Sequence, residues 1–278
     1  MKSWEIRPFR TAEEFRACER LQEETWGEGF SERVPSSILK VVQILGGIAA
    51  GAFGPDGSLV GFVFGMTGVR DGVLVHWSDM LAVKRRLRDS GLGTRLKAYQ
   101  RQVMMERGVT TMHWSFDPLQ SRNAYLNFSK LGIVVREYVR DMYGDLDSPL
   151  HRGIGTDRFI ALWLMDSARV RRRMAGEERG PDASVLNAYA AALDASPGEG
   201  GRSPEPGRVL LGLEDDVVSV AIPADISAIM MDSMERAVAW RQGTRLALRH
   251  YMERGYEVRE LVRGSQTSHY LLFGERLP

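Results

Sequence analysis

The sequence predicts an α/β protein with a mixed central sheet and helices on both of its faces, followed by a smaller region of helix and strand. The first observation is the order of predicted elements over roughly the first 165 residues, β-α-α-β-β-β-α-β-α-β-β. Helices and strands do not alternate from the start, which excludes a dinucleotide-binding fold. A further observation is the stretch RDSGLG at 88–93, which joins a long strand directly to a helix. A mixed sheet with helices on both faces accommodates this order.

The strands are predicted from alternating or continuous apolar runs bounded by turn residues. The turn PDG at 55–57 joins two such runs and indicates a hairpin. The runs predict strands at 4–9, 47–53, 58–66, 72–83, 110–116, 133–139 and 157–165.

The helices are predicted from apolar residues at helical spacing and from their end signals. Thr11 and Glu14 form a capping-box pattern that opens the first helix, and Gly132 is a stop signal for the fourth. The expected helices cover about 12–26, 35–45, 94–106 and 121–132.

The remainder of the chain divides at a stretch rich in proline and glycine, ASPGEGGRSPEPGR at 195–208. Such a composition is typical of a linker or a long exposed loop. We therefore expect a main domain at 1–166, a helical segment with a linker at 167–208, and a C-terminal region at 209–278. Patterns in the last region predict strands at 209–213, 217–222, 256–262 and 268–273, and helix over 225–254.

The C-terminal region resembles an earlier part of the chain. Aligned without gaps, residues 119–140 and 242–263 are identical at eight of 22 positions, Gly132/Gly255 and Val135/Val258 among them. Both segments read as a helix, a glycine stop and a strand. We infer a partial duplication that lacks a glycine loop of its own; chance similarity of two such units is the alternative.

Composition excludes several classes of protein. The net charge is +1, with 37 Lys and Arg against 36 Asp and Glu, so no basic surface for nucleic acid is expected. Cys18 is the only cysteine, which excludes a disulfide framework and a cysteine metal cluster. The start MKSWEIRPFR lacks the apolar core of a signal peptide, and no apolar run approaches the 18 residues of a membrane span. We expect a cytoplasmic protein with no metal, no membrane and no nucleic acid partner.

The stretch RDSGLG places two glycines beside the start of a helix. Gly91 and Gly93 lack a Cβ, so the main chain can adopt conformations closed to other residues and a ligand can approach it closely. The first amides of the helix have no partner within it and favour a negative charge. Together they predict a phosphate site. A mononucleotide loop is excluded because GxxxxGK[ST] and GxGxxG are absent.

The pattern Arg88-x-x-Gly91-x-Gly93, between a strand and a helix, resembles the acyl-coenzyme A loop of the GNAT (Gcn5-related N-acetyltransferase) superfamily. The resemblance covers about residues 4–165. It implies a central sheet of that family's type, acetyl- or succinyl-coenzyme A as co-substrate, and a preceding strand whose end separates from its neighbour. Main-chain groups near Leu81 to Val83 would pair with the pantetheine arm, and one amide there would face the thioester oxygen. The residues that it implies for the carrier are Leu81, Ala82, Val83, Arg88, Asp89, Ser90, Gly91, Leu92, Gly93, Thr94, Asn123 and Phe128.

The family reaction is direct attack of an amine on the thioester, which requires a base because a free amine is charged at neutral pH. His76, Asp79 and Asp117 lie on or near the central strands and are the candidates. Phe128 occupies the position at which many members carry a tyrosine acid. A thiol with a pKa near 8.5 leaves tolerably as thiolate, so an acid is helpful but not obligatory. Tyr125 or Tyr138 is a candidate substitute.

Residues 114–132 and 143–159 resemble a GNAT subgroup linked with N-acylation, notably N-succinylation, of amino acids. This implies carboxylate recognition, for which Arg122, Arg152 and Arg158 are candidates. The main hypothesis is therefore an acyl-coenzyme A-dependent N-acyltransferase for a small amine such as an amino acid. A protein or peptide N-acetyltransferase and a non-catalytic coenzyme A sensor are the alternatives. The sequence leaves homodimer formation open.

Overall fold

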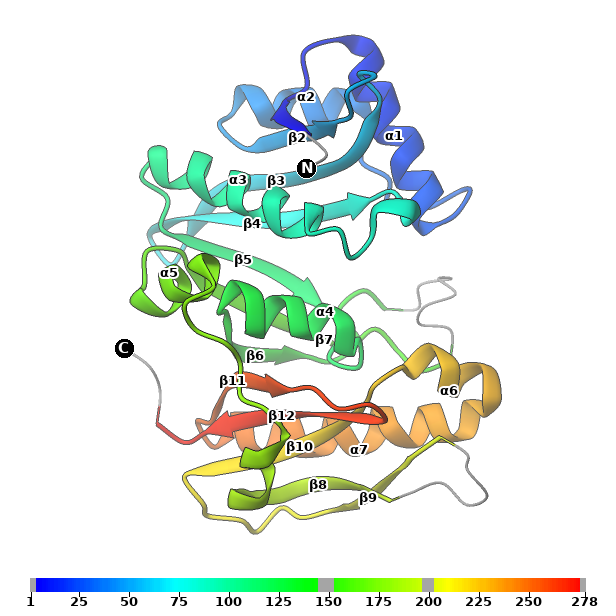
Figure 1. Ribbon diagram of the computed structural model, residues 1–278, viewed down its shortest axis with the longest axis vertical. Coiled ribbons are helices and arrows are strands. Elements are labelled where there is room, and N and C mark those ends of the chain that lie inside the picture. The colour runs from blue at the N-terminus through cyan, green and yellow to red at the C-terminus, as the bar shows by residue number, and fades with distance from the viewer. Residues whose placement is uncertain (1–3, 145–152, 197–202, 276–278) are drawn as a thin grey trace. The chain divides into compact units, whose positions relative to one another are not determined.

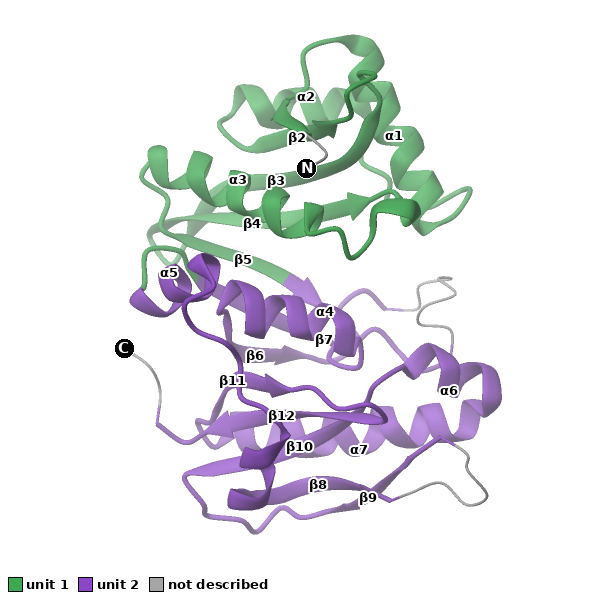
Figure 2. Ribbon diagram, viewed as in Figure 1, with its two compact units in different colours: residues 1–114, 164–167 green, residues 115–163, 168–278 purple. Residues whose placement is uncertain are grey.

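A computed structural model of the chain describes residues 4–144, 153–196 and 203–275. The chain forms two compact units, residues 1–114 with 164–167, and residues 115–163 with 168–278 (Figure 2). The division falls inside one strand, β5 (Thr111–Phe116), whereas the sequence predicts a boundary near residue 166.

The first unit is a sheet whose strands follow the order β1-β2-β3-β4-β5 (Figure 1). Its first three pairings are antiparallel, and β4 and β5 run parallel. The strands are β1 (Glu5–Pro8), β2 (Ile48–Phe53), β3 (Leu59–Arg70), β4 (Val73–Val83) and the first part of β5. The helices are α1 (Ala12–Trp26), α2 (Ser36–Ile44), the short 3₁₀ turn η1 (Arg85–Leu87) and α3 (Leu92–Glu106). The capping box of Thr11 and Glu14 forms as predicted.

The helices of this unit cover opposite faces of β3. Successive side chains of a strand point to opposite faces. Phe62 and Phe64 belong to the core that α1 and α2 complete. Gly61 and Gly65 face α3, where a Cβ would lie 3.2 Å from Leu96 and 3.0 Å from the side-chain nitrogen of Gln100. These two glycines let α3 pack closely on the strand.

The second unit has the strand order β7-β6-β11-β12-β10-β8-β9. The strands are β6 (Val134–Val139), β7 (Arg158–Leu164), β8 (Ala190–Ser196), β9 (Glu205–Val209), β10 (Val217–Pro223), β11 (Glu257–Val262) and β12 (Thr267–Phe273). The helices are α4 (Ser121–Tyr125), its π-helical continuation η2 (Leu126–Leu131), α5 (Ala168–Ala175), the 3₁₀ segment η3 (Ala183–Ala188), α6 (Ile226–Asp232) and α7 (Met234–Glu253). Helix α7 packs on β8, β9 and β10 (Figure 1). Among the described residues no helix has the length and apolar character needed to cross a membrane.

The predicted order of the first eleven elements is confirmed. Two predictions beyond them are wrong. Residues 190–196 form strand β8 and not helix, although alanine favours helices, because β8 is held between β9 and β10. The supposed linker contains strand β9, so the predicted strand at 209–213 lies too late in the chain.

The two similar segments adopt the same local structure. Gly132 and Gly255 each follow a helix and precede a strand, with φ of +72° and +97°. Strands β6 and β11 pair antiparallel, and Val135 lies opposite Val258. These two valines are equivalent in the sequence alignment. An antiparallel pair in which equivalent residues face each other has a local two-fold axis between them, as in a symmetric dimer interface. This arrangement supports the inferred duplication.

The two glycine stops allow a matched test of stability. Gly255→Ala should lower the free energy of unfolding by about 1–2 kcal/mol, the cost of a left-handed conformation, because nothing lies within 4 Å of the added Cβ. Gly132→Ala should cost more, since its Cβ would lie 3.0 Å from Cγ of Arg173, which Glu178 and Glu260 hold in place. Urea denaturation measures both; equal losses would contradict this packing at Gly132.

Candidate active site

The candidate site begins where β4 and β5 separate. The two parallel strands pair at His76 with Met112 and at Trp77 with His113, and the described ladder ends there. β4 continues to Val83 with β3 on its other side. The parallel ladder therefore opens into a fork whose closed end lies at Trp77 and His113.

One edge of β4 is open beyond the fork. The amide of Lys84 donates to the carbonyl of Val60 on β3 at 2.9 Å. Because alternate residues of an antiparallel strand bond to the same neighbour, Met80 and Ala82 direct their main-chain groups to β3. Leu81 and Val83 direct theirs to the side on which β5 has moved away.

A β-bulge lies at the start of this open stretch. Ser78 is opposite Gly65 and Met80 is opposite Phe64, so Asp79 is the extra residue of β4. The bulge changes which face the side chains use. Ser78 bonds to residues of α3, whereas Met80 joins the core under α1 and α2.

The loop after β4 has the predicted glycine conformation at Gly91, whereas Gly93 lies inside α3, which begins two residues earlier than predicted. Gly91 is the N-cap of α3 with φ of +83° and ψ of −2°, and nothing lies within 4 Å of a Cβ built on it. Asp89 is also left-handed, with φ of +64°. Within the described chain the amides of Leu92 to Thr94 donate to no other main-chain group. A left-handed cap before open amides is a suitable cradle for phosphate.

Cations precede this loop. Arg88 is exposed, and with Lys84 and Arg85 it lines a cavity of about 330 Å³ beside the C-terminal part of α1. Glu24 lines the same cavity, 4.0 Å from Lys84. Lys84 and Arg85 were not among the predicted residues, although the run KRRLR at 84–88 is a visible signal of positive charge.

His76 is an unfavourable base in this structure. It is fully buried, its Nε2 accepts from the side-chain amide of Gln100 at 2.9 Å, and its Nδ1 donates to Thr67 at 3.0 Å. Burial, followed by the charges of Lys97 and Arg107, lowers the pKa of His76 to about 3. The imidazole is therefore neutral, with both nitrogens engaged.

Asp117, a second candidate base, lies in a buried ion pair. It accepts two hydrogen bonds from Arg241 of α7, at 2.9 and 2.8 Å, and one from the amide of Leu119. Arg158 lies 4.0 Å from Oδ2 of the same carboxylate. A carboxylate held in this way has a structural role, so Asp117 is not supported as the base.

Of the three candidate bases, Asp79 has the environment that suits the role best. Its side chain is exposed and its only described hydrogen bond is from the indole of Trp77, at 3.3 Å. Desolvation by the surrounding protein raises the pKa of Asp79 above its usual value, and the Trp77 hydrogen bond opposes the shift. A carboxylate with a raised pKa is a better proton acceptor near neutral pH.

Several other predicted residues lie in the second unit. Phe128 is fully buried against Phe116 and Tyr270, which does not support contact with a cofactor. Asn123 and Arg122 are exposed on α4.

Two predicted arginines do not support a carboxylate site. Arg158 is 8% exposed and its guanidinium lies 5.2 Å from the ring centre of Tyr143, so it is largely engaged inside the unit. Arg152 lies outside the described residues.

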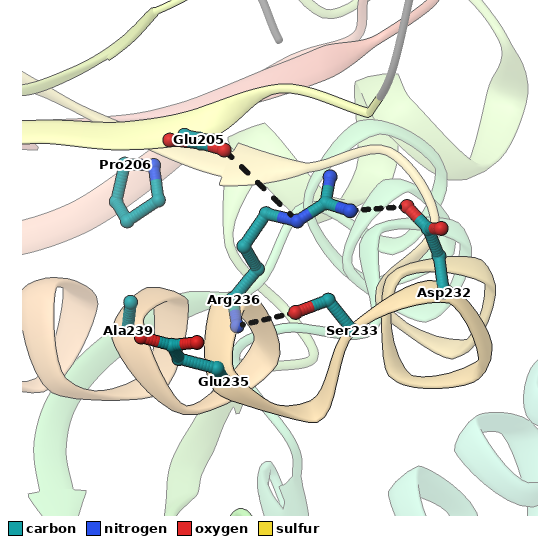
Figure 3. Close-up of a pocket in the computed structure, with 7 residues that line it drawn as sticks. All are labelled: Glu205, Pro206, Asp232, Ser233, Glu235, Arg236 and Ala239. Atoms are coloured by element: carbon teal, nitrogen blue, oxygen red, sulfur yellow. Dashed lines mark hydrogen bonds and ion pairs between the residues drawn. The ribbon is translucent and has the colours of Figure 1, made fainter. Parts of the chain in front are cut away.

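Three further cavities formed by the described residues contain no predicted site residue. One of them, about 600 Å³, lies between β9 and the α6–α7 junction, where Arg236 bonds to Asp232 and approaches Glu205 (Figure 3). In the described residues no group of three or more His, Cys, Asp or Glu side chains could hold a metal ion.

Comparison with known proteins adds the following. No protein family matches the chain, and no curated protein matches it. The ribosomal-protein-S18-alanine N-acetyltransferase from Escherichia coli matches 60% of this chain and 96% of its own, with 16% identity and a TM-score of 0.47. A putative acetyltransferase of the GNAT family from Desulfovibrio desulfuricans matches 59% and 99%, with 18% identity and a TM-score of 0.42. A chain of the NatC complex bound to Gag peptide and CoA matches 58% and 98%, with 15% identity and a TM-score of 0.48.

The buried state of His76 has a spectroscopic consequence. Its imidazole should remain neutral from pH 5 to pH 8, because its pKa lies near 3. Long-range ¹⁵N–¹H correlation spectra of the histidines measure this, with the His76→Gln spectrum for assignment. A titration midpoint near 6.5 would contradict the burial and return His76 to the candidate bases.

Proposed function

We propose that the chain is an acyl-coenzyme A-dependent N-acyltransferase of the GNAT superfamily, acting on a small amine. The observation that carries the proposal is that two sets of main-chain groups without partners among the described residues lie next to each other along the chain. The free edge of β4 at Leu81 and Val83 leads directly to the open amides at the start of α3. A ligand that matches both must carry a group able to pair with a strand at one end and an anion at the other.

Coenzyme A has this construction. Its pantetheine arm contains two amides and about a dozen bonded atoms between the pyrophosphate and the sulfur, hence a reach of about 15 Å. The stretch from Val83 back to Ser78 is five residues, about 17 Å of strand. With the pyrophosphate on Gly91 to Thr94, the arm pairs along β4 and the thioester arrives at the closed end of the fork.

The reaction then follows from the position of the bulge. Asp79 is at the level of the thioester, where it takes a proton from the attacking amine. The carbon–nitrogen bond forms, the carbon–sulfur bond breaks, and the electron pair leaves on the sulfur. Acyl transfer is direct, within a complex of enzyme, donor and amine.

The acyl group is acetyl or succinyl and the acceptor is an amino acid, in keeping with the subgroup resemblance of residues 114–132. Arg122, exposed on α4, is the remaining described candidate for a substrate carboxylate. Transfer to a protein or peptide N-terminus is the second enzymatic hypothesis. A panel of acetyl- and succinyl-coenzyme A with amino acids, D-forms included, and with peptides distinguishes the two by the mass of the product.

The carrier site is tested by two alanine substitutions at opposite ends of α3. Gly91 and Gly108 both have positive φ, +83° and +77°, and nothing lies within 4 Å of either added Cβ. The backbone strain is therefore similar, but only Gly91 caps the proposed phosphate site. Gly91→Ala should weaken coenzyme A binding at least about tenfold, a loss of about 1.4 kcal/mol, while Gly108→Ala leaves it unchanged.

Isothermal titration calorimetry with coenzyme A gives both dissociation constants, and a thiol reagent reports turnover. No binding by the wild-type chain would overturn the proposal. Binding without release of free thiol on any amine would favour the non-catalytic sensor.

Asp79→Asn tests the base. The substitution should lower kcat/KM about 10²–10⁴-fold, and Asp71→Asn, on the exposed turn between β3 and β4, should not. The base works ionised, so wild-type kcat/KM should fall as pH is lowered through the raised pKa of Asp79. Thiol-release kinetics across pH measure this; an unchanged acid limb in Asp79→Asn would exclude Asp79.

A further inference from the structure

A buried lysine lies at the closed end of the fork. The Nζ of Lys97, on α3, is 2.7 Å from the hydroxyl of Ser78 on β4 and 3.8 Å from the ring centre of Trp114 on β5. Ser78 and Trp114 directly follow Trp77 and His113, the last paired residues. The amine therefore spans the first position at which the two strands are no longer bonded to each other.

The surroundings of Lys97 are unusual for an amine. The residue is 5% exposed, and among the described residues no carboxylate lies within ion-pair distance of it. A buried ammonium without a counter-charge loses hydration that one hydroxyl and one ring do not replace. A methionine of similar length would fill the space without this cost, so packing alone does not explain a lysine here.

The groups that face Lys97 leave its charge uncompensated. From β4 these are Ser78 and His76, from β5 Trp114, and from its own helix Gln100. Of these only His76 titrates, and it is neutral above pH of about 3. The hydroxyl of Ser78 donates its proton to the side-chain oxygen of Gln100 at 2.9 Å. The oxygen of Ser78 therefore accepts a hydrogen bond from Nζ of Lys97, which holds the amine in place.

We propose that Lys97 is the acid that protonates the departing thiolate of coenzyme A, a role that rests on the acyltransferase function proposed above. When the carbon–sulfur bond breaks, the electron pair goes to sulfur and a proton passes from the Nζ ammonium to it. The products are the amide and the free thiol, and Lys97 regains a proton from water as the products leave. Charge on the thiolate also supplies the counter-ion that the ammonium lacks.

Two residues considered from the sequence are unsuitable as the acid. Phe128 has no proton to donate. Tyr138 donates its hydroxyl to Asp157, and burial, followed by the charge of Asp157 and this hydrogen bond, raises the pKa of Tyr138 well above its usual value.

The acidity of Lys97 suits the reaction. Burial lowers the pKa of Lys97 to about 7, below that of an ordinary thiol near 8.5, so transfer to the thiolate is downhill. An acid acts in its protonated form. The rate should therefore fall as pH rises through the pKa of Lys97, because the amine loses its proton. The base has the opposite effect, since protonation of Asp79 lowers the rate at low pH.

The test compares Lys97→Met with Lys40→Met, a substitution at an exposed position of α2. Lys97→Met should keep the wild-type dissociation constant for coenzyme A in calorimetry and should not lower the melting temperature. Its kcat at pH 7 should fall about 10²-fold or more, with loss of the alkaline limb of the kcat–pH profile. Ser78→Ala, which removes the hydroxyl that holds Nζ, should lower kcat about tenfold with KM unchanged. Lys40→Met should match the wild type.

The outcomes separate the two proposals. If Lys97→Met binds coenzyme A normally and keeps the wild-type kcat and alkaline limb, Lys97 is not the acid and the acyltransferase function stands. If the wild-type chain binds no coenzyme A, the function fails and the role of Lys97 fails with it. Loss of coenzyme A binding in Lys97→Met alone would also overturn the proposal, because it would make Lys97 a binding residue.

Discussion

The early end of the β4–β5 ladder is the constraint on which the site depends. A strand edge normally finds a partner, because unpaired main-chain groups are costly to bury. Here β4 keeps β3 on one side and opens the other beyond Trp77. The bulge at Asp79 coincides with the opening and turns Ser78 toward α3. The open edge and the orientation of the candidate base thus arise at the same point of β4.

The second unit contains a repeat of helix and strand that lacks an opened strand ladder of this kind among its described residues. Its β11 and β12 follow α7 as β6 and β7 follow η2, and the two-fold relation at Val135 and Val258 places the repeats beside each other. Among the described residues between β8 and β10 the chain forms strand β9 and no helix. The repeat therefore helps enclose the buried pair of Asp117 and Arg241, and its described residues offer no second carrier site of the same design.

Much of the fold could be predicted from the sequence because its signals are local. Capping at Thr11, the glycine stop at Gly132 and the left-handed Gly91 depend on residues within a few positions, and all three are observed. The site residues depend on distant contacts. No residue near Asp117 in the sequence predicts its ion pair with Arg241, which lies 124 residues later. Likewise, burial of His76 needs Gln100 of α3. Lys97 could have been noticed in the sequence, because it is a lysine on the face of α3 that also carries Leu96 and Gln100 and is buried.

The most direct test of the account is amide hydrogen exchange with and without coenzyme A. The account predicts new protection at Leu81 and Val83 and at Leu92 to Thr94, whose amides are open in the free protein. Met80 and Ala82, already bonded to β3, should change little. Protection confined to other parts of the chain, or equal protection of odd and even positions along β4, would contradict an arm that pairs with this edge.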